Sequence, residues 1–326
     1  MTDIVRVSII IPVYNGAATV GAAIDSAFAQ DFDGHEIIVV NDGSTDSTAE
    51  VIARYGARIH TIRQENRGPA SARNAAAAIA GGEYLAFLDA DDRWLPIYLS
   101  SLVAALDRNT NAAMAFCDLV PVQESGEEMR PTSHSGAPSL RDLSNGRWKI
   151  IPSAVVMRGD IFRRCGGFRE EFRRPGGEDH YMWLLARECG KFEYVPVPLV
   201  LYHETPASEL AEKYEEGHHI WVRLIRARYG RRARALVRTA NGYRAALFVA
   251  RATHQLDHAE PCAALASMLR SICAQPSYAL RPAILKRLLH RKNVRRMIVS
   301  LGKGVRRVRN IASSRANSPN DAKLEA

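Results

Sequence analysis

The sequence predicts an α/β fold, in which helices flank a mainly parallel sheet, followed by a helical extension. Short apolar runs alternate with segments whose apolar residues recur at helical spacing, and this alternation continues to about residue 205. From about residue 208 the pattern is helical throughout. We therefore expect an α/β domain at 1–207, a basic helical region at 208–312 and a disordered tail at 313–326.

The first part of the domain predicts strands and helices in strict alternation. We expect strands at 5–13, 36–40, 58–63 and 84–88, and helices at 17–29, 47–55 and 69–80. Ser47 and Glu50 have the spacing of a capping box, and Pro69 stands where a helix can begin. Parallel strands joined by helices place their carboxyl ends at one edge of the sheet, where such folds hold their ligands.

The second part of the domain has a weaker pattern. We expect helices at 96–108 and 178–189 and strands at 112–117, 151–157 and 198–203. Residues 118–148 are rich in Ser, Gly, Pro and charge, which is typical of a mobile loop.

Three carboxylates follow the apolar run at 84–88. A strand buried on both faces would place Asp89, Asp91 and Asp92 at its carboxyl end. Acids this close repel one another unless a cation lies among them, and their hard oxygen atoms suit Mg²⁺ or Mn²⁺ held together with substrate phosphates. An acidic turn that caps the next helix would give the same pattern.

The formal net charge of +9 is concentrated near the C-terminus. Residues 261–326 contain 14 Lys and Arg against 2 acids, whereas residues 1–260 carry a net charge of −3. Between 278 and 311, basic and apolar residues interleave without one acid. This segment could lie on an anionic membrane, bind nucleic acid or form a solvated helix.

The remaining composition favours a cytoplasmic protein. No apolar stretch is long enough to span a membrane, and the first residues lack a secretory signal. The five cysteines are widely spaced and form no Cys-x-x-Cys pair, which indicates neither a zinc site nor a disulfide framework.

Five motifs in order resemble those of the family 2 glycosyltransferases. They lie at 7–15, 39–46, 66–74, 87–92 and 176–179, within a resemblance that covers about 5–205. The resemblance implies the GT-A fold, a Rossmann-like mixed and mainly parallel sheet. It also implies an inverting, metal-dependent enzyme that moves one sugar from a nucleotide-diphosphate donor, with UDP expected, to a saccharide or lipid-linked acceptor. Such acceptors occur in the synthesis of surface polysaccharides and glycans, which favours a peripheral membrane contact over nucleic acid for the basic helices.

The resemblance implies a donor site at the first four motifs. Its residues are Pro12, Tyr14, Asn15, Asp42, Asn66, Gly68, Arg73, Asp89 and Ala90. We expect Pro12, Tyr14 and Asn15 just past the first strand, although an ordinary turn would look the same. A carboxylate at Asp42 can accept hydrogen bonds from a uracil N–H or a ribose hydroxyl. Arg73 could equally be a surface residue that pairs with an acid.

The resemblance also assigns a metal site and a catalytic base. Asp91 and Asp89 would bind Mn²⁺ or Mg²⁺, and His203 would complete the metal shell unless it is an ordinary surface residue. Asp179 matches the base that takes the proton of the attacking sugar hydroxyl.

Glu178 and Trp183 are candidates to line the acceptor site. Two acids at 178 and 179 would also favour the N-terminus of a helix, and a Trp at helical spacing from core leucines also fits packing.

Two other functions share part of this pattern. A catalytically inactive nucleotide-sugar-binding protein would keep the donor motifs but could dispense with Asp179. A sugar nucleotidyltransferase should have a Gly-rich phosphate loop after its first strand, which residues 12–16 do not form. The sequence therefore favours the glycosyltransferase.

Overall fold

The computed structural model describes residues 5–275, apart from 124, 145–147, 149, 174–175, 205–206 and 258–259. The chain forms two compact units, the first made of Met1–Pro206 and Glu212–Ala240, and the second of Ala207–Ala211 and Asn241–Ala326. The predicted basic helix at 278–311 and the predicted tail at 313–326 lie outside the described residues.

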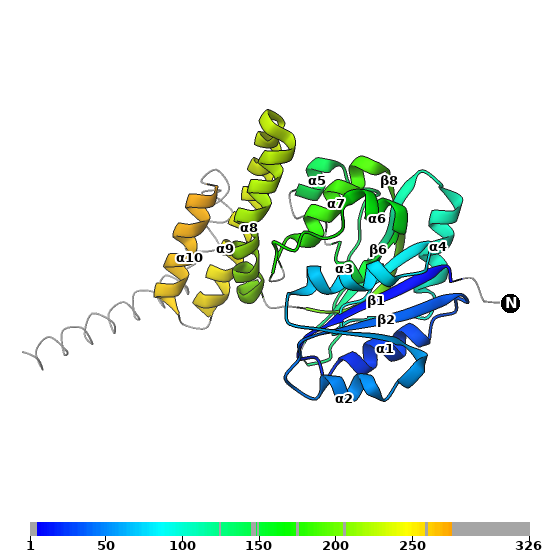
Figure 1. Cartoon of the computed structure of the whole chain (residues 1–326). Helices are drawn as coiled ribbons and strands as arrows, with labels where there is room; N and C mark the ends of the chain where they lie inside the picture. The colour runs from blue at the N-terminus through cyan, green and yellow to red at the C-terminus, as the bar shows by residue number, and fades with distance from the viewer. Residues whose placement is uncertain are drawn as a thin grey trace, which may run out of the picture. The chain divides into compact units, whose positions relative to one another are not determined.

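A mixed sheet of eight strands forms the centre of the first unit (Figure 1). In order across the sheet, its strands are β3 (His60–Gln64), β2 (His35–Asp42), β1 (Val7–Val13), β4 (Tyr84–Phe87), β7 (Val155–Arg158), β6 (Ala112–Val122), β8 (Lys191–His203) and β5 (Arg93–Trp94). β1 runs parallel to β2 and β4, whereas β7 runs antiparallel to β4 and β6. The loops that follow β1, β2 and β4 therefore leave the sheet at the same edge, as the sequence predicted.

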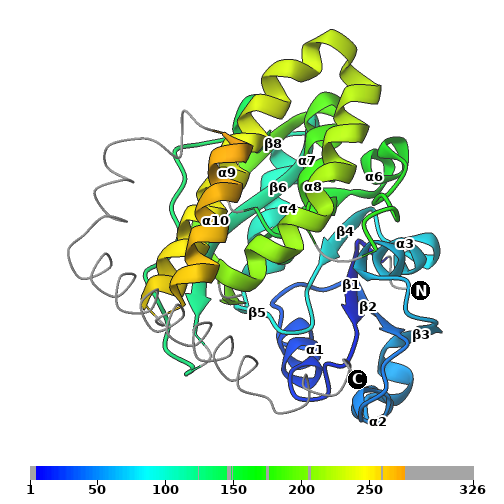
Figure 2. The ribbon, with the colours of Figure 1, turned by 90° about the vertical axis from the view of Figure 1, so that its left-hand side faces the viewer.

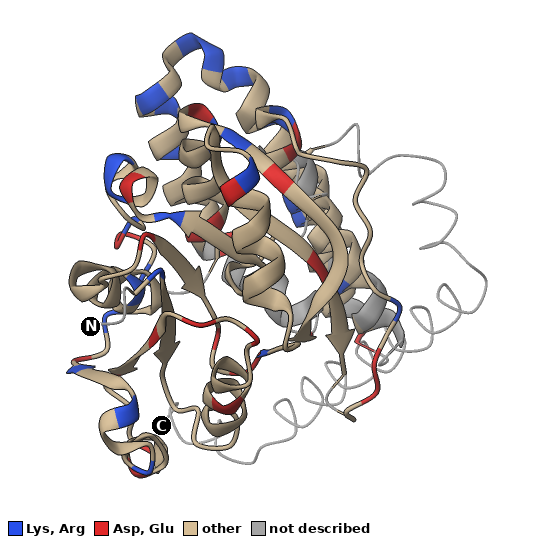
Figure 3. Cartoon of the chain, turned by 90° about the vertical axis from the view of Figure 1, so that its right-hand side faces the viewer, with Lys and Arg blue, Asp and Glu red and all other residues tan. Residues whose placement is uncertain are grey.

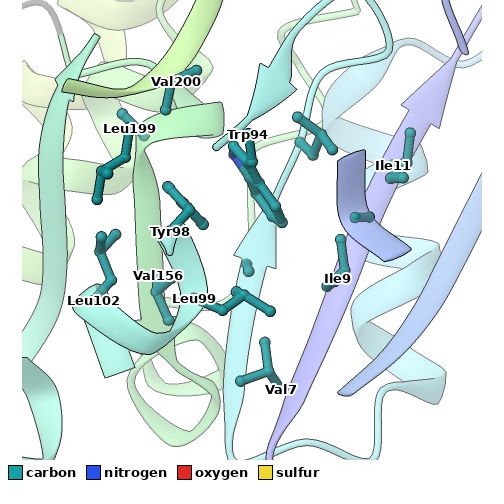
Figure 4. Close-up of a cluster of buried hydrophobic side chains, with 14 of the residues drawn as sticks. Val7, Ile9, Ile11, Trp94, Tyr98, Leu99, Leu102, Val156, Leu199 and Val200 are labelled. Carbon is teal, nitrogen blue, oxygen red and sulfur yellow. The ribbon is translucent and has the colours of Figure 1, made fainter. Parts of the chain in front are cut away.

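Helices cover both faces of this sheet because its central strands are apolar on both sides. Ile9 and Ile11 of β1 belong to one core cluster, with side chains of α1 (Val20–Phe28) and α4 (Tyr98–Arg108) (Figure 4). Ile10 belongs to the opposite cluster, with side chains of α3 (Pro69–Ile79), α6 (Gly159–Cys165) and α7 (Glu178–Cys189). The remaining short helices are α2 (Thr48–Ala53), η1 (Gly56–Arg58), α5 (Leu140–Ser144) and η2 (Pro152–Ala154).

Several local features of the structure differ from the predictions. The helices α5 and α6 and the edge strand β5 were not predicted, and β8 is much longer than the predicted strand at 198–203. The capping box does not form, because Ser47 makes no capping bond and Asp46 accepts the N–H of Thr48 instead, at 3.1 Å. Within the predicted loop at 118–148, β6 continues to Val122 and the chain then folds back, with Thr132 N–H bonded to the Leu119 carbonyl.

The predicted helical extension is confirmed. Its described part, up to residue 275, contains α8 (Ala207–Tyr229), η3 (Gly230–Arg232), α9 (Ala233–Asp257) and α10 (Pro261–Ala274). Within the first unit, Trp221 and Ile225 of α8 lie in one buried cluster with Leu184 of α7. Figure 2 labels both helices. Within the second unit, the Ser271 hydroxyl of α10 donates to the Ala245 carbonyl of α9, at 2.9 Å. None of the helices in the described part of the chain is both long enough and apolar enough to cross a membrane.

Candidate active site

The loops after β1, β2 and β4 lie side by side. Asn15 has a positive φ of 51°, and its side-chain oxygen accepts the N–H of Thr45 at 2.8 Å. Its own N–H donates to the Ser44 hydroxyl at 3.0 Å. The Cβ of Ala90 lies 3.8 Å from the position that a Cβ on Gly16 would occupy. The turn formed by residues 89–92, which we call the aspartate turn, therefore lies beside the β1 loop.

Two predicted donor residues differ in exposure. Tyr14 follows β1 and is 51% exposed. Pro12 instead lies inside β1 and is buried, as the expected strand at 5–13 implies, so the separate expectation that Pro12 stands past the end of the strand is wrong. The strand continues through Pro12 to Val13 because the β1 register with β2 persists there.

Asp42 fixes the segment that leads into α3. One of its carboxylate oxygens accepts the N–H groups of Gln64 Nε2 at 2.7 Å and of the Arg67 backbone at 2.9 Å. The other oxygen accepts the Gly68 N–H at 2.8 Å. The Asp42 side chain is buried, so these charge-assisted bonds are strong and hold the 64–68 segment, which includes the exposed Asn66, against β2.

Gly68 allows a distant segment to approach the start of α3. Its φ is 88°, and a Cβ at this position would overlap the carbonyl oxygen of Arg173. The Asn74 amide donates to the Phe168 carbonyl at 2.9 Å, which holds the same segment one turn further along α3. The chain just before α7 is therefore seated on α3.

Arg73 connects two of the acidic motifs. Its guanidinium is buried and donates to Asp89 at 2.5 Å and to Glu178 at 3.2 Å. It also lies over the Phe168 ring, 5.3 Å from its centroid. Arg73 is therefore a buried bridge between the aspartate turn and the N-terminus of α7, whereas the sequence left open a surface position.

Ser153 organises the aspartate turn and was not predicted. Its hydroxyl accepts the Asp89 N–H at 3.0 Å and donates to Asp92 at 2.5 Å. The other Asp92 oxygen accepts the N–H of His203, at 2.9 Å, so the end of β8 is held beside the turn. Burial and the neighbouring charges of Asp91 and Asp89 raise the pKa of Asp92 well above its usual range. The only signal for Ser153 in the sequence is a polar residue just before a buried strand.

The predicted metal ligands offer few but suitable oxygen atoms. Among the residues that the structure describes, no three His, Cys, Asp or Glu side chains gather closely enough to hold a metal ion. Asp91 is exposed at the tip of the turn, and the Asp89 side chain is 29% exposed beside it. One or two carboxylates together with substrate phosphates are the donor set that Mg²⁺ typically uses, so this part of the chain fits such a cation.

Asp179 lies in the first turn of α7 and makes its contacts through one oxygen. Its Oδ1 accepts the His180 N–H at 2.7 Å and lies 3.1 Å from His180 Nδ1. Burial alone would raise the pKa of Asp179, but the charge and hydrogen bonds of His180, together with Arg73, lower it overall. Asp179 is therefore ionised at neutral pH, and its Oδ2 accepts no hydrogen bond from the described residues.

Glu178 has the opposite electrostatic environment. Burial and the charge of Asp179 raise its pKa, despite the opposing effect of Arg73. Its carboxylate is buried between Arg73 and the Gly176 N–H, which it accepts at 2.9 Å. The prediction that Glu178 lines the acceptor site is therefore wrong, because Arg73 and Gly176 take up its side chain.

Trp183 is also a packing residue. It is fully buried, and its indole N–H donates to the Ile150 carbonyl at 2.9 Å. A side chain with no exposed surface cannot line an open acceptor site, so this prediction is wrong as well.

Helix α8 packs closely against the turn that precedes Glu178. A Cβ on Gly217 would overlap the carbonyl oxygen of Gly176, so only glycine allows α8 to approach this closely. Trp221, one turn further along α8, lies 3.8 Å from the position that a Cβ on Gly177 would occupy. The position of Asp179 therefore depends on α8, which no local sequence pattern revealed.

The comparison with known families identifies the family of the chain. Residues 8–170, half of the chain, match the family described as Glycosyl transferase family 2. The chain belongs to glycosyltransferase family 2. This family assignment makes the protein a glycosyltransferase, and the resemblance predicted from the five motifs is confirmed.

Two of the curated relatives match about two thirds of the chain. An uncharacterised glycosyltransferase of Rickettsia typhi is 30% identical over 228 residues, which cover 66% of this chain and 70% of that protein. One of Rickettsia felis is 32% identical over 232 residues, but the match covers only 37% of its length. The Escherichia coli protein WfaP, a UDP-Glc:α-D-GlcNAc-diphosphoundecaprenol β-1,3-glucosyltransferase, is 42% identical over 99 residues, 30% of this chain and 39% of WfaP.

Solved structures share the fold. S. aureus TarS 1–349 has a TM-score of 0.59 at 18% identity, over 90% of both chains. The same TarS fragment in complex with UDP-GlcNAc has a TM-score of 0.58. The predicted GT-A arrangement, with its curled sheet, flanking helices and C-terminal helices, is thereby confirmed.

Proposed function

We propose that the protein is an inverting, metal-dependent glycosyltransferase that moves one sugar from a UDP-sugar to a saccharide or lipid-linked acceptor. In this proposal Asp179 is the base and Asp91, with Asp89, binds the cation. Tyr14, Asn15, Asp42 and the loop that carries Asn66 and Gly68 form the nucleoside side of the donor site, as the family motifs imply.

The observation that carries this proposal is the double contact of Arg73. By donating to both Asp89 and Glu178, the guanidinium brings the donor-side acid and the base-side acid of two distant motifs next to each other. A sugar transfer needs this arrangement, because the leaving diphosphate and the attacking hydroxyl must lie on opposite sides of one anomeric carbon.

The two neighbouring acids of α7 differ in the property that a base requires. The pKa of Asp179 is lowered and that of Glu178 is raised, so Asp179 is ionised and its Oδ2 can accept a proton. The acceptor oxygen would form the new bond to the anomeric carbon while its proton passes to Oδ2. The bond from the anomeric carbon to the diphosphate breaks on the opposite face, which inverts the configuration.

A divalent cation, when bound, would stabilise the negative charge on the departing diphosphate as a Lewis acid. Asp91 and Asp89 would hold it, and Asp92 and Ser153 keep the turn that carries them in place. A ligand role for His203 stays a prediction, supported by the bond that holds its backbone beside Asp92.

The relatives support the choice of donor and acceptor. TarS has been solved with UDP and with UDP-GlcNAc, and WfaP uses a UDP-sugar and an acceptor linked to diphosphoundecaprenol. We extend these properties to this chain as a UDP-sugar donor and a lipid-linked saccharide acceptor of the cell envelope. Such an acceptor would place the enzyme at the cytoplasmic face of the membrane.

The test separates the enzyme from an inactive binding protein. Wild type should be stabilised against heat by UDP and by one of a panel of UDP-sugars, more strongly with Mn²⁺ than without it. Asp179→Asn should keep this stabilisation but lose about 10²-fold or more in UDP release with acceptor present. Asp91→Ala should lose the Mn²⁺-dependent part of donor binding.

Glu171→Gln is the matched control, because Glu171 is an exposed acid of the same region that pairs with Arg223. It should match wild type in both assays. Equal turnover by wild type and Asp179→Asn would assign the base elsewhere, and UDP binding without any transfer would favour the inactive binding protein.

A further inference from the structure

A dense group of arginines surrounds the turn between α8 and α9. Residues 223–238 contain seven Arg and no Lys, Asp or Glu. We call this segment the arginine turn. All seven side chains are exposed, and the whole segment lies in the first compact unit. Figure 3 shows the Lys and Arg positions of the chain in blue.

Most of this charge is not neutralised. Arg223 pairs with Glu171 at 3.0 Å, and Arg228 pairs with Glu188 at 2.5 Å. In the described part of the chain the other five form no ion pair; they are Arg226, Arg231, Arg232, Arg234 and Arg238. Five exposed guanidinium groups around the junction of α8, η3 and α9 repel one another, so an anionic partner that spans several of them would bind favourably.

The arginine turn is anchored in the core of the first unit. Ile225 and Ala233, on its two sides, are buried in the cluster that also contains Leu184 of α7. The pair between Arg228 and Glu188 adds a polar contact to α7. A partner would therefore meet charges that are already in place, without a cost for ordering the backbone.

We propose that the arginine turn binds the phosphate groups of an anionic lipid surface. Guanidinium groups bind phosphate in a bidentate manner, which distinguishes a cluster of arginines from a cluster of lysines. The apolar side chains of the turn face the protein core, so the contact would be made at the level of the headgroups. The choice of lipid as the source of phosphate rests on the proposed lipid-linked acceptor, whereas the affinity for phosphate does not.

The surface of the turn also disfavours single-stranded nucleic acid. Such sites stack bases on exposed aromatic rings, but Trp221 is buried and Tyr229 is only partly exposed. An RNA duplex, which is bound through its phosphates, is the competing partner for the test.

The experiment compares two full-length variants of equal net charge. In the first, Arg226, Arg231, Arg232 and Arg234 are replaced by Gln. In the control, four exposed arginines elsewhere are replaced by Gln, namely Arg54, Arg63, Arg108 and Arg130. Partition coefficients are measured by co-sedimentation with vesicles of phosphatidylcholine, alone or mixed with phosphatidylglycerol, at low and high salt. Thermal unfolding confirms that both variants fold.

Each basic residue near an anionic surface contributes about fivefold to the partition coefficient, so the first variant should bind about two to three orders of magnitude more weakly at low salt. The control should bind like wild type, and salt should reduce wild-type binding. Equal loss in both variants, equal binding to neutral vesicles, or binding to an RNA duplex without binding to vesicles would overturn the proposal. Because the vesicle assay contains no nucleotide-sugar donor, a negative result would not bear on the proposed sugar transfer.

Discussion

Replacement of Arg73 by Met tests the buried bridge at the centre of the site. The Arg73 side chain is 4% exposed, and its partners Glu178 and Asp89 are 6% and 29% exposed. Met fills a similar volume but leaves Glu178 without its cation. Removal of one partner from a buried pair costs about 3–5 kcal/mol of the free energy of unfolding. We expect a loss in this range, measured by urea denaturation near neutral pH.

Arg67→Met is the matched control. Arg67 also connects the start of α3 to an acid of the segment before α7, Glu170, at 2.7 Å, but these side chains are 63% and 42% exposed. Exposed pairs contribute about 0–1 kcal/mol, so this variant should stay close to wild type. Equal losses for Arg67→Met and Arg73→Met would refute the reasoning that burial makes the Arg73 bridge strong.

The loss in Arg73→Met should depend on pH. The folded pKa of Glu178 is already raised, so its ionisation lowers stability as pH rises from the unfolded pKa, about 4.3, through the folded pKa. Without Arg73 the folded pKa rises further, and the deficit should be full at neutral pH and shrink below about pH 4.3, where Glu178 is neutral in both states. Glu178→Gln in the same chain should recover part of the loss at pH 7. A deficit that is independent of pH would contradict this account.

Three further variants test single contacts of the site. Ser153→Ala leaves buried Asp92 without its hydroxyl donor, so it should lose about 1–3 kcal/mol in urea denaturation and weaken Mn²⁺-dependent UDP binding, whereas Ser100→Ala on the surface should change neither. His180→Asn removes the charge that lowers the pKa of Asp179, so the acid limb of kcat/KM should shift to higher pH; an unshifted profile would exclude this influence. Gly217→Ala should lower both stability and kcat by displacing the turn before α7, and unchanged values would show that α8 can move away without consequence.

The sequence by itself determined the repeating strands and helices of the first half and the position of its polar motifs. These features follow from local physics, because the spacing of apolar residues sets each element and parallel strands must release their loops at one edge. Asp42 and Asp89 could therefore be placed at one edge of the sheet, whereas Asp179 was assigned to the site only through the family motifs. The family motifs added roles that the spacing alone did not supply.

Only the tertiary structure decided which of these polar groups contact one another. Arg73 looks the same in the sequence whether it faces solvent or lies buried between Asp89 and Glu178, because long-range packing sets its partners. Burial of the Glu178 and Trp183 side chains likewise contradicts their predicted contact with the acceptor. Ser153 and Gly217 contact residues that are distant in the chain, and a local sequence pattern does not predict such contacts.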